Sequence, residues 1–123
     1  MSMTLVLGAS TNPARYSNIA TKRLLDAGEE VCLVGAREGE IYGHRIQTDI
    51  ANCQGPVDTV TLYLGPQRQA TFIDPIIEQL QPRRIIFNPG TENDAFETAA
   101  KEAGIEVMRA CTLVMLASSQ YRA

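Results

Sequence analysis

The sequence predicts one α/β domain built around a parallel β-sheet. Short apolar runs alternate with helical patterns along the 123 residues, and no repeat or long linker divides the chain. The apolar runs are largely continuous, as in strands that helices cover on both faces of a parallel sheet. The composition agrees with a globular domain, since 45% of the residues are hydrophobic and 20% are charged. We therefore expect a single domain over residues 1–123.

Five apolar runs are expected to be strands, and helical patterns connect them. The expected strands are residues 5–7, 31–34, 57–64, 85–87 and 105–108. Apolar stripes with helical spacing run over residues 19–25, 72–80 and 96–103. Gly28 and Gly104 are expected to follow the ends of the first and third helices, and Thr91 to cap the third. Pro75 should lie in the first turns of the second helix or bend it.

Two segments follow this alternation less closely. Residues 36–57 are irregular, and within them residues 41–46 are expected to form a small extra turn or hairpin. The tail, residues 112–118, is expected to add a short final turn or helix against the sheet. Its apolar Leu-Val-Met-Leu run is also a candidate contact surface for a homodimer or an unknown protein partner.

Strands that alternate with helices favour parallel pairing with right-handed crossovers. The sequence therefore predicts a Rossmann-like fold with strand order 3-2-1-4-5 and helices on both faces of the sheet. In that order the winding reverses between strands 1 and 4, where ligands bind at the carboxyl ends of the strands. The turn after strand 1 would then face the turn formed by Asn88, Pro89 and Gly90 after strand 4.

Charge and cysteine content argue against several classes of protein. The net charge is −3 and the isoelectric point is about 5.1, whereas nucleic-acid-binding domains are usually basic. No apolar stretch approaches the roughly 20 residues that span a bilayer, and the pattern of a secretory signal is missing. Cys32, Cys53 and Cys111 form no CxxC pair, and with His44 as the only histidine no metal site is expected. We expect Cys32 to be a small, reduced core residue and the protein to be cytoplasmic.

The turn after the first expected strand is the strongest candidate for a binding site. Residues 8–18 read GASTNPARYSN and join an apolar strand to a helix. A strand, a tight polar turn and a helix N-terminus together present free backbone N–H groups to an anion. Only the first glycine of the GxGxxG dinucleotide pattern is present, at Gly8. Arg15 could add positive charge for a pyrophosphate, with Ser10, Thr11 and Ser17 as hydroxyl donors.

The end of the second strand distinguishes between nucleotide classes. NAD is usually held by an Asp or Glu near this point, because a carboxylate accepts hydrogen bonds from the ribose diol. Here the chain reads Val34-Gly35-Ala36-Arg37. A guanidinium pairs with phosphate and not with a diol. Arg37 therefore favours a ligand with a phosphate on its adenosine ribose, which is coenzyme A in the first place and NADP in the second.

Five stretches of the chain, in the same order, match a known family. They are GASTNPARYSN, LLDAGEEVCLVGAREGEIYG, VDTVTLYL, NPGTEN and AAKEAGIEVMRACTLVML. With these stretches the chain resembles the small stand-alone CoA-binding domain proteins, which are similar to the CoA-binding domain of the succinyl-CoA synthetase alpha subunit. Family members often carry Asn-Pro where this chain has Gly35 and Ala36.

The resemblance implies a Rossmann-like fold that holds CoA across the strand ends, and it implies three groups of contacts. Those that would line the pyrophosphate turn are Gly8, Ala9, Ser10, Asn12, Arg15 and Ser17. Those that would meet the adenosine end are Val34, Ala36 and Arg37. Leu64, Gly65 and Pro66 would close over the ligand, and Asn88, Pro89 and Gly90 would face its pantetheine arm.

No arrangement of side chains in the sequence predicts a catalyst. The synthetase reaction needs a phosphorylated histidine on a second domain, which we do not expect this chain to supply, and His44 lies in the irregular segment. Cys111 could form a mixed disulfide with the CoA thiol or simply pack before the last turn. The expected function is non-catalytic binding of CoA or an acyl-CoA, in a regulatory or carrier role. An NADP-linked oxidoreductase and a CoA-responsive scaffold subunit are the alternatives.

Overall fold

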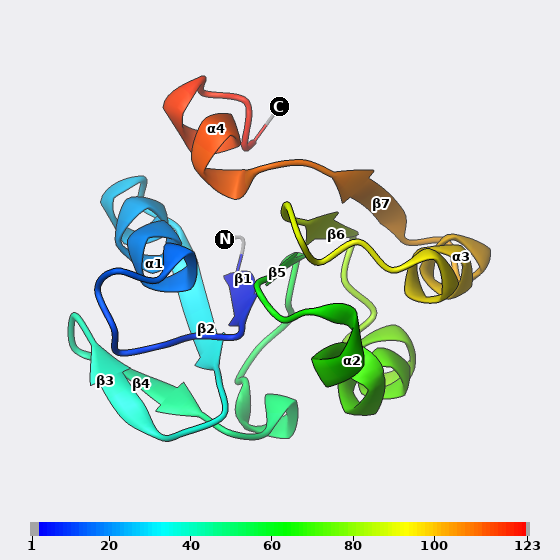
Figure 1. Ribbon diagram of the computed structural model, residues 1–123, viewed down its shortest axis with the longest axis horizontal. Coiled ribbons are helices and arrows are strands. Elements are labelled where there is room, and N and C mark those ends of the chain that lie inside the picture. The colour runs from blue at the N-terminus through cyan, green and yellow to red at the C-terminus, as the bar shows by residue number, and fades with distance from the viewer. Residues whose placement is uncertain (1–2, 123) are drawn as a thin grey trace.

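The computed structural model describes residues 3–122 and has one seven-stranded sheet between two layers of helices (Figure 1). The order across the sheet is β3-β4-β2-β1-β5-β6-β7, and all neighbours are parallel except β3 and β4. The strands are β1 (Met3–Leu7), β2 (Glu30–Val34), β3 (Gly39–Ile41), β4 (His44–Gln47), β5 (Thr59–Leu62), β6 (Arg84–Phe87) and β7 (Glu106–Arg109).

The five expected strands are present as β1, β2, β5, β6 and β7, but their predicted order is wrong. β1 pairs with β2 on one side and with β5 on the other, so the expected strands follow the order 2-1-3-4-5. The winding therefore reverses between β1 and β5, and not between the first and fourth strands. Both β1 and β5 are buried along nearly their whole length. Their apolar patterns identify them as central strands but do not specify which neighbour each one has.

The two additional strands come from the irregular segment, residues 36–57. β3 and β4 form an antiparallel hairpin, which confirms the expected extra hairpin, and β4 then pairs in parallel with β2. Ile41 and Ile46 are the buried residues of these two strands. One apolar residue per strand is too weak a pattern to reveal a strand of the main sheet, and for this reason the prediction of five strands was too low.

Helices cover both faces of the sheet, as predicted (Figure 1). One face carries α1 (Tyr16–Asp26) and α4 (Thr112–Ala117), and α4 is the short helix expected for the tail. The other face carries α2 (Pro66–Gln69), η2 (Ala70–Phe72), η3 (Pro75–Leu80) and α3 (Asp94–Glu102). A single turn, η1 (Ile50–Asn52), precedes β5. No helix in the described part of the chain is long and apolar enough to cross a membrane.

Two helix boundaries differ from the prediction. The expected second helix is interrupted at Pro75, which has no N–H to donate to the preceding turn. The chain continues from there as the π-helix η3, which is wider than an α-helix. Asn93, and not Thr91, caps α3, because its Oδ1 accepts a hydrogen bond from Phe96 N at 3.1 Å. Thr91 instead donates its hydroxyl to the carbonyl oxygen of Asn88, at 2.8 Å.

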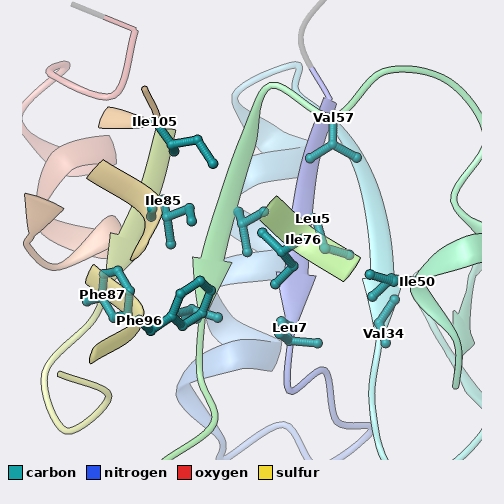
Figure 2. Close-up of a cluster of buried hydrophobic side chains, with 13 residues drawn as sticks. Leu5, Leu7, Val34, Ile50, Val57, Ile76, Ile85, Phe87, Phe96 and Ile105 are labelled. Carbon is teal, nitrogen blue, oxygen red and sulfur yellow. The ribbon is translucent and has the colours of Figure 1, made fainter. Parts of the chain in front are cut away.

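The larger hydrophobic core lies between the sheet and the helices on the face that carries α2 and α3 (Figure 2). The rings of Phe87 on β6 and Phe96 on α3 meet edge to face there, with 5.3 Å between their centroids. Both side chains are fully buried, so truncation of either one to alanine would cost roughly 3–5 kcal/mol. A second core on the α1 and α4 face includes Val6, Leu24 and Met115.

Cys32 on β2 and Cys53 after η1 form a disulfide, with 5.8 Å between their Cα atoms. The expectation that Cys32 is a reduced core residue was therefore wrong. A spacing of 21 residues matches no short cysteine motif, so the sequence contained no signal for this pair. The bond joins the end of the irregular segment to the middle of the sheet, and Cys111 is the free cysteine among residues 3–122.

The C-terminal tail packs against the amino end of the sheet. The hydroxyls of Thr4 on β1 and Tyr121 share a hydrogen bond of 2.6 Å. The guanidinium of Arg84, which is 3% exposed, donates to Tyr121 O at 2.6 Å and lies over the Tyr121 ring. Arg122 pairs with the buried carboxylate of Glu29. The tail therefore supplies one of the hydrogen-bond acceptors for the buried guanidinium of Arg84, the first residue of β6.

Candidate functional site

The carboxyl edge of the sheet at β1 and β5 is the candidate site. These strands are neighbours, and the chain leaves β1 for α1 on one face and leaves β5 for α2 on the other (Figure 1). Doubly wound sheets bind ligands at such a reversal, because the loops after the two strands diverge there. The loop after β1 is residues 8–15, and the loop after β5 is residues 63–65. The loops after β2 and β6 flank this pair.

Gly8 begins the first loop in a backbone conformation that favours glycine. Its φ is +103°, and a Cβ at this position would be 3.0 Å from the carbonyl oxygen of Tyr63. The N–H groups of Gly8 and Ala9 both donate to Val34 O, at 2.8 and 3.0 Å. The sequence-predicted residues Gly8, Ala9 and Val34 therefore lie together, and the backbone contacts among them fix where the loop starts.

Side chains of the loop itself hold its middle part in one shape. Asn12 N donates to Ser10 Oγ at 3.1 Å, and Ala14 N donates to Asn12 Oδ1 at 2.9 Å. The buried amide of Asn18 donates to Ser10 O at 2.9 Å and so connects the loop to α1. The sequence prediction did not include Asn18 in the site. Ser10 and Asn12 use these side-chain oxygens within the loop, whereas the hydroxyl of Thr11 is on an exposed residue.

The start of α1 is open toward the same edge. Arg15 occupies the N-cap position with an extended backbone, and no side chain caps the helix there. Uncapped N–H groups and the helix dipole favour an anion at this point, and the exposed guanidinium of Arg15 adds a positive charge. Ser17, in the first turn, is buried. The predicted pyrophosphate loop therefore has the features that an anion site needs at its helix end.

The loop after β2 touches the loop after β1 directly. A Cβ on Gly35 would lie 2.3 Å from the carbonyl oxygen of Ala9, so only glycine allows the two backbones to approach this closely. Gly35 N donates to Gln47 O on β4 at 2.9 Å, which fixes the loop from the other side. Ala36 and Arg37 follow and are exposed. No ion pair between residues of the described range includes Arg37.

The loop after β5 lies against Gly8 from the other side. Leu64 is partly buried, and its Cδ2 atom would be 3.2 Å from a Cβ placed on Gly8. Gly65 and Pro66 are exposed, and Pro66 is the first residue of α2, a position where the missing N–H has no cost. The structure therefore brings Leu64, the residue that was expected to close over a ligand, into contact with the first loop.

Asn88, which directly follows β6, uses its side chain inside the protein. Its Nδ2 donates to Thr61 Oγ1 at 2.7 Å and to Leu62 O at 2.8 Å, and its Oδ1 accepts from Thr112 N at 2.9 Å. These bonds connect β6 to β5 and to the start of α4. Pro89 and Gly90 are exposed beyond it. Because β5 lies between β1 and β6, the loop at Asn88 does not adjoin the first loop as the predicted strand order required.

Tyr63, at the end of β5, was not singled out in the sequence. Its hydroxyl is buried and has no hydrogen-bond partner among the described residues. Burial raises the pKa of Tyr63 to about 12, although the nearby hydroxyls of Thr61 and Thr112 oppose the shift. Those two hydroxyls bond to each other at 2.8 Å. The only sequence signal was an aromatic residue at the end of a buried strand, and such a residue is most often part of a core.

Other charged residues lie outside this group of loops. His44 is exposed at the start of β4, in the hairpin at one end of the sheet. At the opposite end, the guanidinium of Arg109 pairs with the carboxylates of Asp94 at 2.6 Å and Glu97 at 2.9 Å. A shallow hollow of about 430 Å³ surrounds this cluster beside β7 and α3. Asp94, Glu97 and Arg109 are paired with one another there, and β6 separates β7 from β5, so the hollow is not part of the candidate site.

Comparison with known proteins finds a matching family and several similar structures. Residues 2–117 match the family described as CoA binding domain. A crystal structure of an uncharacterized protein is 44% identical with a TM-score of 0.91, over 98% of each chain. Cell-free ID.343 from Thermus thermophilus is 24% identical with a TM-score of 0.87, over 97% of this chain and 90% of that chain.

A larger enzyme contains a similar fold as one of its parts. The dinucleotide forming acetyl-coenzyme A synthetase 1 of Ca. Korarchaeum cryptofilum has a TM-score of 0.72 at 18% identity, over 89% of this chain and 25% of that chain. A search of curated proteins finds no match. Since the family match spans nearly the whole chain, this protein belongs to the CoA binding domain family.

Proposed function

We propose that this protein binds coenzyme A or an acyl-CoA at the carboxyl edge of the sheet, without catalysis, in a regulatory or carrier role. The observation that carries the proposal is the family match over residues 2–117. The structure adds that helix α1, whose N-terminus has no side-chain cap, starts where the winding of the sheet reverses. The fold thus offers an anion site where doubly wound proteins bind nucleotides.

The pyrophosphate of CoA would lie at the loop after β1 and the start of α1. Gly8 and Ala9 place the loop, Ser10 and Asn12 shape it, and the exposed Arg15 supplies a positive charge. Thr11 and Ser17 complete the proposed contacts. A phosphate oxygen at the uncapped end of α1 would accept from backbone N–H groups that no side chain of the helix cap engages.

The adenosine end would lie at the loop after β2, beyond Val34 and Gly35. Arg37 is exposed there, and no ion pair within residues 3–122 occupies its guanidinium. The contact between Gly35 and Ala9 keeps this loop beside the pyrophosphate loop. A guanidinium in this place suits the 3′-phosphate of CoA, and Ala36 would pack beside it.

The pantetheine arm would run along the loops after β5 and β6. Leu64, Gly65 and Pro66 form one wall, and Pro89 and Gly90 are the exposed residues of the other. Asn88 would act there mainly through its backbone, because its side-chain amide is engaged by Thr61, Leu62 and Thr112. The proposed contacts thus assign a loop to each part of CoA, from the ribose phosphate to the pantetheine arm.

The role without catalysis rests on the placement of the reactive side chains. His44 lies in the β3–β4 hairpin at the edge of the sheet, and the carboxylates of Asp58, Asp94 and Glu97 are paired with arginines. An NADP-linked oxidoreductase would require a hydride-transfer set at the carboxyl edge, and no observation favours it. A CoA-responsive scaffold subunit would use the same binding site, and it differs from a carrier only in having a protein partner.

Thermal unfolding with added nucleotides tests the proposal. Bound CoA should stabilise the protein by about 2.7 kcal/mol at a hundredfold excess over its dissociation constant. NAD should give no stabilisation, because Arg37 stands where a carboxylate would hold its ribose diol. Stabilisation by NAD alone would contradict the proposal, and stabilisation by NADP above that by CoA would favour the oxidoreductase instead.

Arg37→Ala should weaken the binding of CoA much more than the binding of dephospho-CoA, which lacks the 3′-phosphate. A lost arginine–phosphate pair at an exposed position should reduce the affinity for CoA about tenfold. Isothermal titration of both ligands measures the difference. Arg23→Ala removes an equal charge from the last turn of α1, at the far end of that helix, and serves as the control. Equal losses for both ligands would mean that Arg37 does not recognise the phosphate.

A further inference from the structure

Gln69, the last residue of α2, is a fully buried polar side chain with all parts of its amide engaged. Its Nε2 donates to Leu64 O at 2.8 Å and to Thr91 O at 2.8 Å. Its Oε1 accepts from the Nδ2 of Asn93 at 2.9 Å. Both donors and the acceptor are therefore used, and the orientation of the amide is fixed by its partners.

These partners belong to the two loops that follow neighbouring strands. Leu64 is the second residue after the end of β5, whereas Thr91 and Asn93 lie between β6 and α3. The hydrogen-bond ladder between β5 and β6 ends with Leu62 opposite Phe87, so beyond that pair no sheet hydrogen bond joins the two segments that follow these strands. Gln69 continues the connection, because one side chain bonds to the backbone of both loops. The distance between the loops therefore depends on this amide.

We propose that Gln69 is a positioning residue that sets the spacing between the two walls of the pantetheine site without touching the ligand. The inference rests on the proposed function, which assigns Leu64, Gly65 and Pro66 to one wall and Pro89 and Gly90 to the other. If one of these loops moves by about 1 Å, the site can lose much of its binding energy for CoA, because contacts with the flexible pantetheine arm depend on preorganised walls. Under the proposed function the adenosine end of CoA would lie on the loops after β1 and β2, and the hydrogen bonds of the Gln69 amide go to Leu64, Thr91 and Asn93 instead.

Gln69→Glu is the sharpest test of this assignment. It keeps the shape of the side chain but replaces both N–H donors with an oxygen that faces the carbonyl groups of Leu64 and Thr91. Gln67→Glu makes the same chemical change on the exposed face of α2, so it controls for the added negative charge near an anionic ligand. The ligands are CoA and adenosine 3′,5′-bisphosphate, which lacks the pantetheine arm.

Isothermal titration should show that Gln69→Glu lowers the affinity for CoA at least about tenfold. The affinity for adenosine 3′,5′-bisphosphate should change less than about twofold, and Gln67→Glu should change neither affinity by more than that. A merely structural role would instead reduce both affinities together or lower only the unfolding temperature. Equal losses for both ligands, or an unchanged CoA affinity in the folded variant, would overturn the inference.

Asn93→Asp provides the test if Gln69→Glu does not fold. The aspartate keeps the Oδ1 acceptor for Phe96 N at the start of α3, but it has no N–H to donate to Gln69. We expect a smaller loss that is again confined to CoA. A failure of the proposed function looks different, because the unmodified protein would then bind neither CoA nor adenosine 3′,5′-bisphosphate.

Discussion

Tyr63 shows how a single residue can depend on the folded environment. Its hydroxyl lies buried at the carboxyl end of β5 with no hydrogen-bond partner among the described residues. A buried hydroxyl without a partner typically costs about 1–3 kcal/mol, and the ionised phenolate would be less favourable still. Burial is also the largest cause of the raised pKa of this phenol.

Tyr63 should therefore make stability depend on pH in the alkaline range. The pKa of Tyr63 is about 12 in the folded protein, against the ordinary tyrosine pKa of 10.0 in the unfolded chain. The unfolded chain loses the proton first, so the contribution of Tyr63 to stability is complete below pH 10 and is lost as the pH rises toward 12. Denaturant unfolding of the protein and of Tyr63→Phe over this range isolates the effect.

In that experiment, the stability of the unmodified protein should fall more steeply with pH than the stability of Tyr63→Phe. Tyr42→Phe removes a hydroxyl from an exposed tyrosine of the hairpin and is the matched control. Parallel curves for the protein and Tyr63→Phe above pH 10 would show that burial does not perturb this phenol.

Most of the residues predicted for the site lie in loops at the carboxyl edge of the sheet, but the sequence could not assign their hydrogen-bond partners. Asn88 was expected to face a ligand, whereas its amide holds β5, β6 and α4 together. Gln69 was not identified at all, and Asn18 was given no role although it lies in the predicted turn, because a buried amide and an exposed one look alike in a sequence. Gln69 bonds to a residue 22 positions away in the sequence, and Asn18 bonds to one 8 positions away. No local sequence pattern encodes partners at such separations.

At the scale of elements, the meeting of the loops after β1 and β2 depends on Gly35. Gly35→Ala should destabilise the protein by roughly 1–3 kcal/mol, since the new Cβ would stand 2.3 Å from the carbonyl oxygen of Ala9. The backbone must then move apart, and with it the loop that carries Arg37. Chemical denaturation measures the loss of stability, and CoA titration measures the accompanying loss of affinity.

Gly65→Ala is the control for this substitution. Gly65 has φ −66°, which any residue can adopt, and a Cβ there would meet nothing within 4 Å. We therefore expect its stability to stay within about 0.5 kcal/mol of the unmodified protein. If both alanine variants lost the same stability, the close approach at Gly35 would not be the cause.

The existence of five of the seven strands and of the helices was predictable, whereas the order of the strands across the sheet was not. Each of the five apolar runs is a strand, and α1, α3 and α4 begin and end close to the expected residues. The order across the sheet was wrong because β1 and β5 are both buried on each face, so either could have had other neighbours. The interruption at Pro75 could be anticipated only as a bend, since the wider turn of η3 depends on its packing against the core.

For the molecule as a whole, the Cys32–Cys53 disulfide is the covalent link between the irregular segment and the sheet. It closes a loop with a sequence separation of 21 residues, and such a loop should contribute about 3 kcal/mol by limiting the unfolded chain. Reduction should therefore lower the unfolding temperature by roughly 10 °C. Thermal unfolding with and without a dithiol reductant measures this shift.

Two serine variants identify which cysteine is responsible. Cys53→Ser should unfold at the temperature of the reduced protein and should not respond to the reductant. Cys111→Ser keeps the disulfide and should behave like the unmodified protein in both conditions. A thiol assay that finds three free cysteines in the untreated protein, together with no response to the reductant, would contradict this account.

The contact between Thr4 and Tyr121 has a consequence for how the chain acquires its structure. Thr4 on the first strand and Tyr121 in the tail are 117 positions apart, yet a hydrogen bond joins their hydroxyls, and the buried Arg84 donates to the carbonyl oxygen of the same tyrosine. Contacts of such long range form late and slow folding, because much of the chain must be ordered before they are gained. During synthesis, β1 would therefore gain this hydrogen bond only after Tyr121 has left the ribosome. A truncation before Tyr121 would remove the hydrogen bond that Tyr121 makes to Thr4 at the amino end of β1, although it removes nothing from the proposed binding site.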